Sequence, residues 1–85
     1  MTSFTYTITH TLGLHARPAA LLADVCKSLT SQVSICKEGR SASASGLVSL
    51  LLLEVRQGDT VTISLEGPDE AQEAQALETF FRANL

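Results

Sequence analysis

The chain has 85 residues with a formal net charge of -3, and 45% of them are hydrophobic while 18% are charged. This length holds one small domain with a single core, and the hydrophobic share is too high for a disordered chain. The acidic balance and the lack of tryptophan argue against a nucleic-acid-binding protein, which needs a basic face and aromatic stacking surfaces. We therefore expect one globular domain over residues 1–85.

The chain offers little for metal, redox or membrane chemistry. Cys26 and Cys36 are isolated and lack the ligand spacing of a zinc site or a redox pair, so we expect reduced thiols, no metal and no cofactor. Residues 1–5 lack the basic and apolar regions of a signal peptide. No apolar run approaches the roughly 20 residues that span a bilayer. These observations predict a cytoplasmic protein without membrane insertion.

Periodicity predicts the elements of the first half. Apolar and threonine side chains alternate over residues 4–8, which is typical of a half-buried strand. Over about residues 16–29 the apolar residues recur at spacings of three and four, as on one face of a helix. Alternation resumes at residues 33–37, and residues 38–39 predict a tight turn into a short edge strand at 40–43.

The second half begins with an ambiguous segment. The apolar run 47–53 is compatible with a buried strand or a buried helix; we favour a short helix, because Ser45 can cap it and β-branched residues are almost absent. Residues 60–66 alternate again and predict the fourth strand. Residues 67–70 end that strand and open the last helix, with Asp69 as its cap. The expected buried face of this helix consists of Ala71, Ala74, Leu77 and Phe81.

The predicted order of elements is therefore βαββαβα. Such an order is typical of an α+β fold with helices packed on an antiparallel sheet. We expect an open-faced sandwich, in which a four-stranded antiparallel sheet carries three helices on one face.

The chemistry concentrates in the segment GLHARPAA, which starts at Gly13. Gly13 permits a tight turn, and Pro18 suits the first turn of a helix. His15 can act as a nucleophile near neutral pH, and Arg17 is a fixed cation with a planar set of donors. The backbone N–H groups of Ala16 and Arg17 would lack partners inside the helix and could donate to an anion. This combination predicts a phosphate-handling site.

Two further features have weaker patterns. His10 ends the first strand, and we expect it to be an exposed residue without a role; a metal site shared with His15 lacks recognisable ligand spacing. Part of the second helix should remain exposed, because a helix that is apolar all round leaves an apolar patch. We expect Leu47, Val48 and Leu51 to face, in part, the protein that exchanges phosphate with His15.

Residues 13–19, GLHARPA, resemble the active-site signature of the HPr family, the histidine phosphocarriers of the bacterial phosphotransferase system. The resemblance extends over nearly the whole chain, including the element order and the glycines at positions 39 and 58. It implies that His15 accepts a phosphoryl group from phosphorylated enzyme I and passes it to the A-component of a sugar-specific enzyme II, in sugar uptake or its regulation. It also implies that the phosphoryl group sits on the ring Nδ1, stabilised by Arg17 and the start of the helix.

The resemblance also bears on partners and regulation. It implies a monomer without a reaction of its own, with regulatory proteins as further partners. In many Gram-positive members a serine that starts the second helix is phosphorylated; Gly46 stands here, so we expect no regulatory serine. Leu12 and residues 50–53 look more like the nitrogen-related paralogues, or like the phosphocarrier modules of multidomain proteins. The implied docking face for donor and acceptor consists of Ala16, Ala20, Leu47, Val48 and Leu51.

The sequence is also compatible with two other functions. One is a non-catalytic, HPr-like regulatory protein that binds partners without relaying phosphate. The other is a ferredoxin-like domain that binds a small ligand, because the βαββαβ order occurs in such folds too. A covalent phosphate on His15 would distinguish the phosphocarrier from both.

Overall fold

The computed structural model describes all of residues 1–85. Its elements follow the predicted order βαββαβα, and the predicted boundaries lie within two residues of the observed ones. None of the helices has the length and apolar content that a bilayer crossing requires. The elements are β1 (Thr2–Thr7), α1 (Ala16–Ser28), β2 (Gln32–Lys37), β3 (Arg40–Ser43), α2 (Leu47–Leu52), β4 (Thr60–Glu66) and α3 (Glu70–Asn84).

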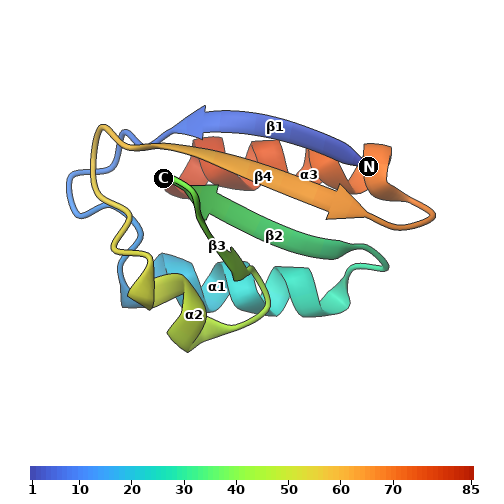
Figure 1. Cartoon of the computed structure of the whole chain (residues 1–85), viewed down its shortest axis with the longest axis horizontal. Coiled ribbons are helices and arrows are strands. Elements are labelled where there is room, and N and C mark those ends of the chain that lie inside the picture. Colours follow the sequence, from blue (N-terminus) through green and yellow to red (C-terminus); the bar gives the residue numbers. More distant parts are fainter.

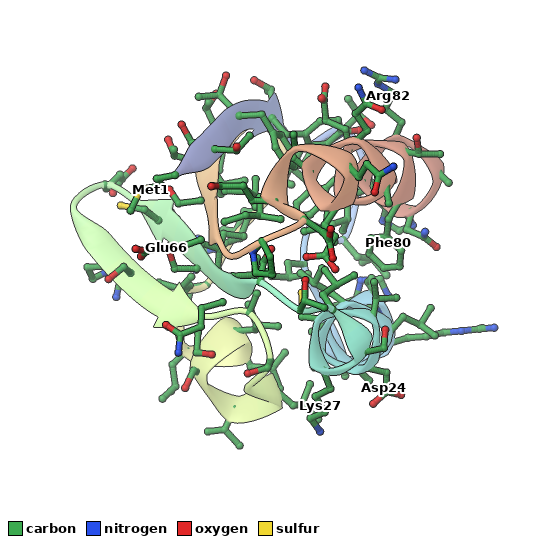
Figure 2. All side chains as sticks on the ribbon, turned by 90° about the vertical axis from the view of Figure 1, so that its right-hand side faces the viewer. Met1, Asp24, Lys27, Glu66, Phe80 and Arg82 are labelled. Carbon is green, nitrogen blue, oxygen red and sulfur yellow. The ribbon has the colours of Figure 1, made fainter.

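The strands form one four-stranded antiparallel sheet in the order β1-β4-β2-β3 (Figure 1). Ile63 of the inner strand β4 lies opposite Phe4 of β1 and Ile35 of β2. β3 is an edge strand, as its short, small-residue sequence predicts. Figure 2 shows α1 and α3 side by side on one face of the sheet, and α2 packs against α1 and β3. The predicted open-faced α+β sandwich is confirmed.

Apolar side chains of the sheet and helices meet in one core of 19 buried residues. Leu22 of α1, Ile63 of β4 and Leu77 of α3 are each at most 1% exposed. The ring of Phe81 in α3 meets that of Phe4 in β1 edge to face, with ring centroids 5.9 Å apart. Full burial of side chains of this size contributes about 1.5–3 kcal/mol each. These contacts hold α1 and α3 against the sheet, and with them the loop that leads into α1.

The cap predicted for α2 is wrong. Gly46 takes the N-cap position, and the Ser45 hydroxyl instead forms a hydrogen bond with the Ser43 hydroxyl at 2.9 Å. The helix forms without a side-chain cap, because Leu50 is fully buried and its N–H donates to the Gly46 carbonyl at 3.0 Å. The helix is therefore held by the burial of Leu50 and by backbone hydrogen bonds, without a side chain at its N-terminus.

The start of α3 also differs in detail from its prediction. Asp69 takes the predicted N-cap position, but its carboxylate accepts a hydrogen bond from the Thr30 hydroxyl and makes no cap. Ala71 is exposed, contrary to prediction, because Glu73 turns inward in this turn. The Glu73 carboxylate accepts the N–H groups of Thr30 and Ser31 at 2.9 and 3.0 Å. The remaining residues predicted for this face are buried: Ala74, Leu77 and Phe81.

Candidate functional site

His15 occupies the N-cap position of α1, with an extended backbone at φ -95° and ψ -177°. Its carbonyl accepts the Ala19 N–H at 3.0 Å, which starts the helix. The His15 side chain makes no capping hydrogen bond and is half-buried. The imidazole is therefore available for other chemistry at the mouth of the helix.

The loop that carries His15 is anchored to a distant part of the chain. The segment between β1 and α1 lies beside the segment between α2 and β4 (Figure 1). Gly13 has φ +64°, and a Cβ at this position would lie 2.5 Å from the Val55 carbonyl oxygen. The buried Leu14 donates its N–H to the same oxygen at 3.0 Å. Only glycine allows this close approach, so Gly13 is required by the tertiary packing as well as by the turn.

The His15 ring has one hydrogen-bond partner within the chain. Its Nδ1 lies 3.2 Å from the Gly13 carbonyl oxygen. A carbonyl oxygen only accepts, so in this arrangement Nδ1 carries the proton and Nε2 has the free lone pair. Phosphorylation at Nδ1, which the family resemblance implies, therefore requires loss of this proton and rotation of the ring away from Gly13.

The first turn of α1 presents free donors beside His15. The N–H groups of Ala16 and Arg17 have no acceptor within the chain, and Pro18 has no N–H. No acidic residue lies in this turn. Because the positive end of the helix dipole is also here, the turn favours an anion next to His15.

Arg17 lies on the exposed side of the same turn. Its guanidinium forms no ion pair or hydrogen bond within the chain, so its donors are available to a bound group. Arg17 and His15 line one shallow hollow of about 290 Å³. The structure thus brings together the side chains and amides that the sequence predicts for phosphate binding. The other residues that line the hollow are His10, Pro18, Leu21, Ala83 and Asn84.

His10 lies at the site, although the sequence predicts no role for it. It is exposed, as expected, but its ring lies against that of His15, with centroids 5.3 Å apart and planes inclined by 32°. The Gly13 N–H donates to the His10 carbonyl at 3.0 Å, which closes a tight turn and folds the chain back on itself. Glycine at the last position of a turn is a known turn signal, so the sequence could have indicated the turn at residues 10–13, whereas the pairing of the two rings is visible only in the structure.

The predicted docking face is partly exposed. Ala16 is exposed and Ala20 half-buried on α1. On α2, Val48 is 69% exposed, whereas Leu47 and Leu51 are 39% and 38% exposed. Because α1 packs against α2, these side chains come from two neighbouring helices. Four more large apolar residues that the prediction did not include are exposed: Met1, Leu12, Leu21 and Leu52.

Gly46 stands at the N-cap of α2, where the family resemblance would place a regulatory serine. Its backbone is extended, with φ -106° and ψ 110°, which any residue can adopt. A Cβ here would lie 3.3 Å from the Ser49 Oγ, the end of a short rotatable side chain. The geometry at this position would therefore accommodate a serine, but the glycine of this chain has no hydroxyl to be phosphorylated.

The rest of the surface has no comparable cluster. A larger hollow of about 670 Å³ is lined by serines of β2, β3 and β4 together with Cys26 and Lys27 of α1, and it includes none of the predicted site residues. No three potential metal ligands come together. Burial raises the pKa of the Cys26 thiol to about 11, so this thiol stays protonated near neutral pH and is a poor nucleophile.

Comparison with known proteins gives one consistent result. A family model described as "PTS HPr component phosphorylation site" matches residues 2–83. The phosphocarrier protein HPr of Cupriavidus necator is 38% identical over 71 residues, which cover 84% of this chain and 80% of that protein. The structure of HPr-C-His from Thermoanaerobacter tengcongensis superposes with a TM-score of 0.92 at 34% identity, covering 98% of this chain and 93% of that one.

A further solved structure differs in assembly. Crh of Bacillus subtilis is 29% identical and superposes with a TM-score of 0.77, covering 100% of this chain and 98% of that one. It is described as an intertwined dimer with a swapping domain. Proteins with this fold thus include one that exchanges part of its structure between two copies.

Proposed function

Because this chain belongs to the HPr family of phosphocarrier proteins, we propose that His15 accepts a phosphoryl group from phosphorylated enzyme I and passes it to an enzyme II A-component. The main support for this proposal is the position of His15 at the N-terminus of α1, next to Arg17 and to two backbone N–H groups without partners. The chain is a carrier rather than an enzyme, because it is itself modified by the phosphoryl group and then gives that group up to the next protein.

The transfer exchanges one bond to phosphorus for another. A ring nitrogen of His15 donates its lone pair to phosphorus while the bond between phosphorus and the donor breaks, and the donor keeps that electron pair. For attack by Nδ1, the proton that this nitrogen carries in the free protein first moves to Nε2 by exchange with water, and Nε2 keeps it during the transfer. The bound group carries about two negative charges, which the Ala16 and Arg17 N–H groups and the Arg17 guanidinium can balance. The reverse exchange delivers the group to the acceptor.

The exposed apolar residues supply a surface on which donor and acceptor can dock in turn. Val48 projects from α2 next to α1, and Ala16 adjoins His15 in sequence. A partner seated on both helices would reach His15 and exclude water from the transfer. We include regulatory proteins among the partners of this face, which consists of Ala16, Ala20, Leu47, Val48 and Leu51.

We propose further that residues 1–85 act as a single domain, as a monomer, in the cytoplasm. The monomer is supported by the sheet, because β1 pairs with β4 of the same chain from Thr2 to Thr7. In this arrangement β1 takes its place at the edge of the sheet within one chain, without exchange of a strand with a second copy. The molar mass by light scattering would distinguish a monomer from a dimer in which strands are exchanged.

Phosphorylation with enzyme I and phosphoenolpyruvate tests the proposed function. Intact mass spectrometry should show one added phosphoryl group that mild acid removes, because phosphohistidine is acid-labile. The His15→Ala variant should remain unmodified, while the control variant Thr11→Ala, changed at an exposed loop residue, should be modified like the unchanged protein. Absence of label on the unchanged protein, or equal label on His15→Ala, would refute the proposal.

A further inference from the structure

The rings of His10 and His15 form a pair at the phosphoryl site. Their centroids are 5.3 Å apart, and both line the hollow that Arg17 also borders. The turn closed by the hydrogen bond from the Gly13 N–H to the His10 carbonyl holds the two residues together. A group bound to the His15 ring would therefore lie within reach of the His10 ring.

The hydrogen bonding of His10 determines which of its ring nitrogens carries the proton. The Leu12 N–H donates to the His10 Nδ1 at 3.1 Å, so Nδ1 must present a lone pair. In a neutral imidazole the proton then sits on Nε2. Nothing in the chain accepts a hydrogen bond from this Nε2–H, since the one hydrogen bond of the His10 side chain is the bond from the Leu12 N–H to Nδ1. The loop thus holds a second imidazole with a free donor beside His15.

We propose that His10 is an additional phosphoryl-binding residue, whose Nε2–H donates to an oxygen of the phosphoryl group on His15. The proposal rests on the proposed phosphocarrier function. A phosphoryl group offers three strong acceptor oxygens, and α1 supplies donors from its own side only. His10 comes from the loop before the helix, so it contributes a donor from a separate segment. Phosphorylated His15 is then stabilised relative to the free carrier.

The equilibrium between phosphorylated enzyme I and this protein measures that stabilisation. An equilibrium constant depends only on the free reactants and products, so effects on docking do not enter it. The His10→Asn variant is the informative one. Its Oδ1 can still accept the Leu12 N–H two residues on, but its amide nitrogen ends short of the Nε2 position of histidine and cannot replace that donor beside His15. His10→Ala removes both features, and Thr11→Ala serves as the matched control.

We expect His10→Asn and His10→Ala to lower the equilibrium constant by about tenfold, as loss of a hydrogen bond to a charged group does, and Thr11→Ala to leave it unchanged. If His10→Asn matches the unchanged protein while only His10→Ala falls, His10 merely shapes the loop and the proposal is wrong. The proposal is equally wrong if neither variant changes the constant. Failure of the unchanged protein to take phosphate would instead overturn the proposed function.

Nuclear magnetic resonance of the ring protons gives a second readout. In the unchanged protein the His10 Nε2–H should move downfield and exchange more slowly with water when His15 is phosphorylated, because it enters a hydrogen bond to an anion. A His10 Nε2–H signal that does not respond to phosphorylation would contradict a direct contact, whatever the equilibrium constants show.

Discussion

The backbones of Gly13 and Val55 lie so close together that no side chain fits at position 13. A Cβ on Gly13 would lie 2.5 Å from the Val55 carbonyl oxygen and 2.7 Å from the Arg56 Cα. The same carbonyl accepts the Leu14 N–H. The reactive histidine is therefore placed by a contact between two loops, with α1 beginning directly after it.

Gly13→Ala should destabilise the protein and also impair phosphorylation. The positive φ alone costs about 1–2 kcal/mol for a residue with a Cβ, and the overlap with Val55 adds to that cost. Gly39→Ala is the matched control, because Gly39 also has a positive φ but has nothing within 4 Å of its Cβ position. Urea unfolding should show the larger loss for Gly13→Ala. Equal losses in the two variants would mean that the contact with Val55 is unimportant.

Arg17→Ala should slow phosphoryl transfer without affecting stability. The side chain is exposed and unpaired, so the free energy of unfolding should change by less than about 0.5 kcal/mol. Loss of a donor to the transferring group should lower the rate of transfer from enzyme I by about 100-fold. Rapid-quench kinetics would measure the rate, with Lys27→Ala at the other end of α1 as the control. A rate like that of the unchanged protein would remove Arg17 from the mechanism.

Val48→Asp should weaken docking and leave the fold intact. Val48 is 69% exposed, so the substitution buries no charge in the free protein. In a docked complex the carboxylate would lose water without gaining a partner, and we expect KM for enzyme I to rise about tenfold or more with little change in kcat. Ala76→Asp, at an exposed position of α3, introduces the same charge elsewhere. An equal rise in KM for both variants would indicate a general charge effect and contradict the docking face.

Gly46→Ser should be tolerated and should introduce a hydroxyl where the family resemblance expects a regulatory one. The extended backbone at Gly46 suits serine at an N-cap, which is more favourable than glycine by a few tenths of a kcal/mol. The unfolding temperature should therefore stay equal or rise slightly. A kinase that phosphorylates Gram-positive HPr should label this variant and not the unchanged protein. Label on the unchanged protein that Ser45→Ala removes would show that Ser45 serves instead.

Two carboxylates make stability depend on pH in the acid range. The Arg56 N–H, followed by the Lys37 ammonium, lowers the pKa of Asp59 below its ordinary value. The Ser31 hydroxyl, followed by the Thr30 N–H, lowers the pKa of Glu73. A carboxyl group whose pKa is lower in the folded state stabilises the fold above its ordinary pKa, and this contribution is lost as the pH falls through the folded value. We therefore expect stability to fall below about pH 4.

Glu73→Gln provides the test of this pH dependence. The variant should be less stable than the unchanged protein near neutral pH, and the difference should shrink as the pH falls below about 4. Asp24→Asn is the control, because Asp24 points into solvent from the outer face of α1 (Figure 2) and forms no ion pair. Urea unfolding at several pH values measures both. A constant difference between Glu73→Gln and the unchanged protein would show that ionisation of Glu73 does not contribute.

Much of the fold could be predicted because its signals are local. The alternation at residues 60–66 and the spacing over 16–29 each arise from a side-chain period that a strand or helix imposes on its own segment. The caps of the helices were less predictable, because a capping side chain can form its hydrogen bond with another part of the chain instead. Ser45 could have capped α2 but bonds Ser43, and Asp69 could have capped α3 but bonds Thr30.

The sequence by itself determined the chemistry of this protein, since GLHARPAA places a nucleophile, a cation and a helix start within a few covalent bonds of one another. Only the tertiary structure decided which other residues surround His15 and Arg17. Three features depend on how separate parts of the chain are placed in space. They are the contact of Gly13 with Val55, the bonds of Glu73 to the segment after α1, and the pairing of the His10 and His15 rings. The periodicity of apolar residues does not predict such contacts, because the position of an irregular segment depends on the helices and strands that it connects.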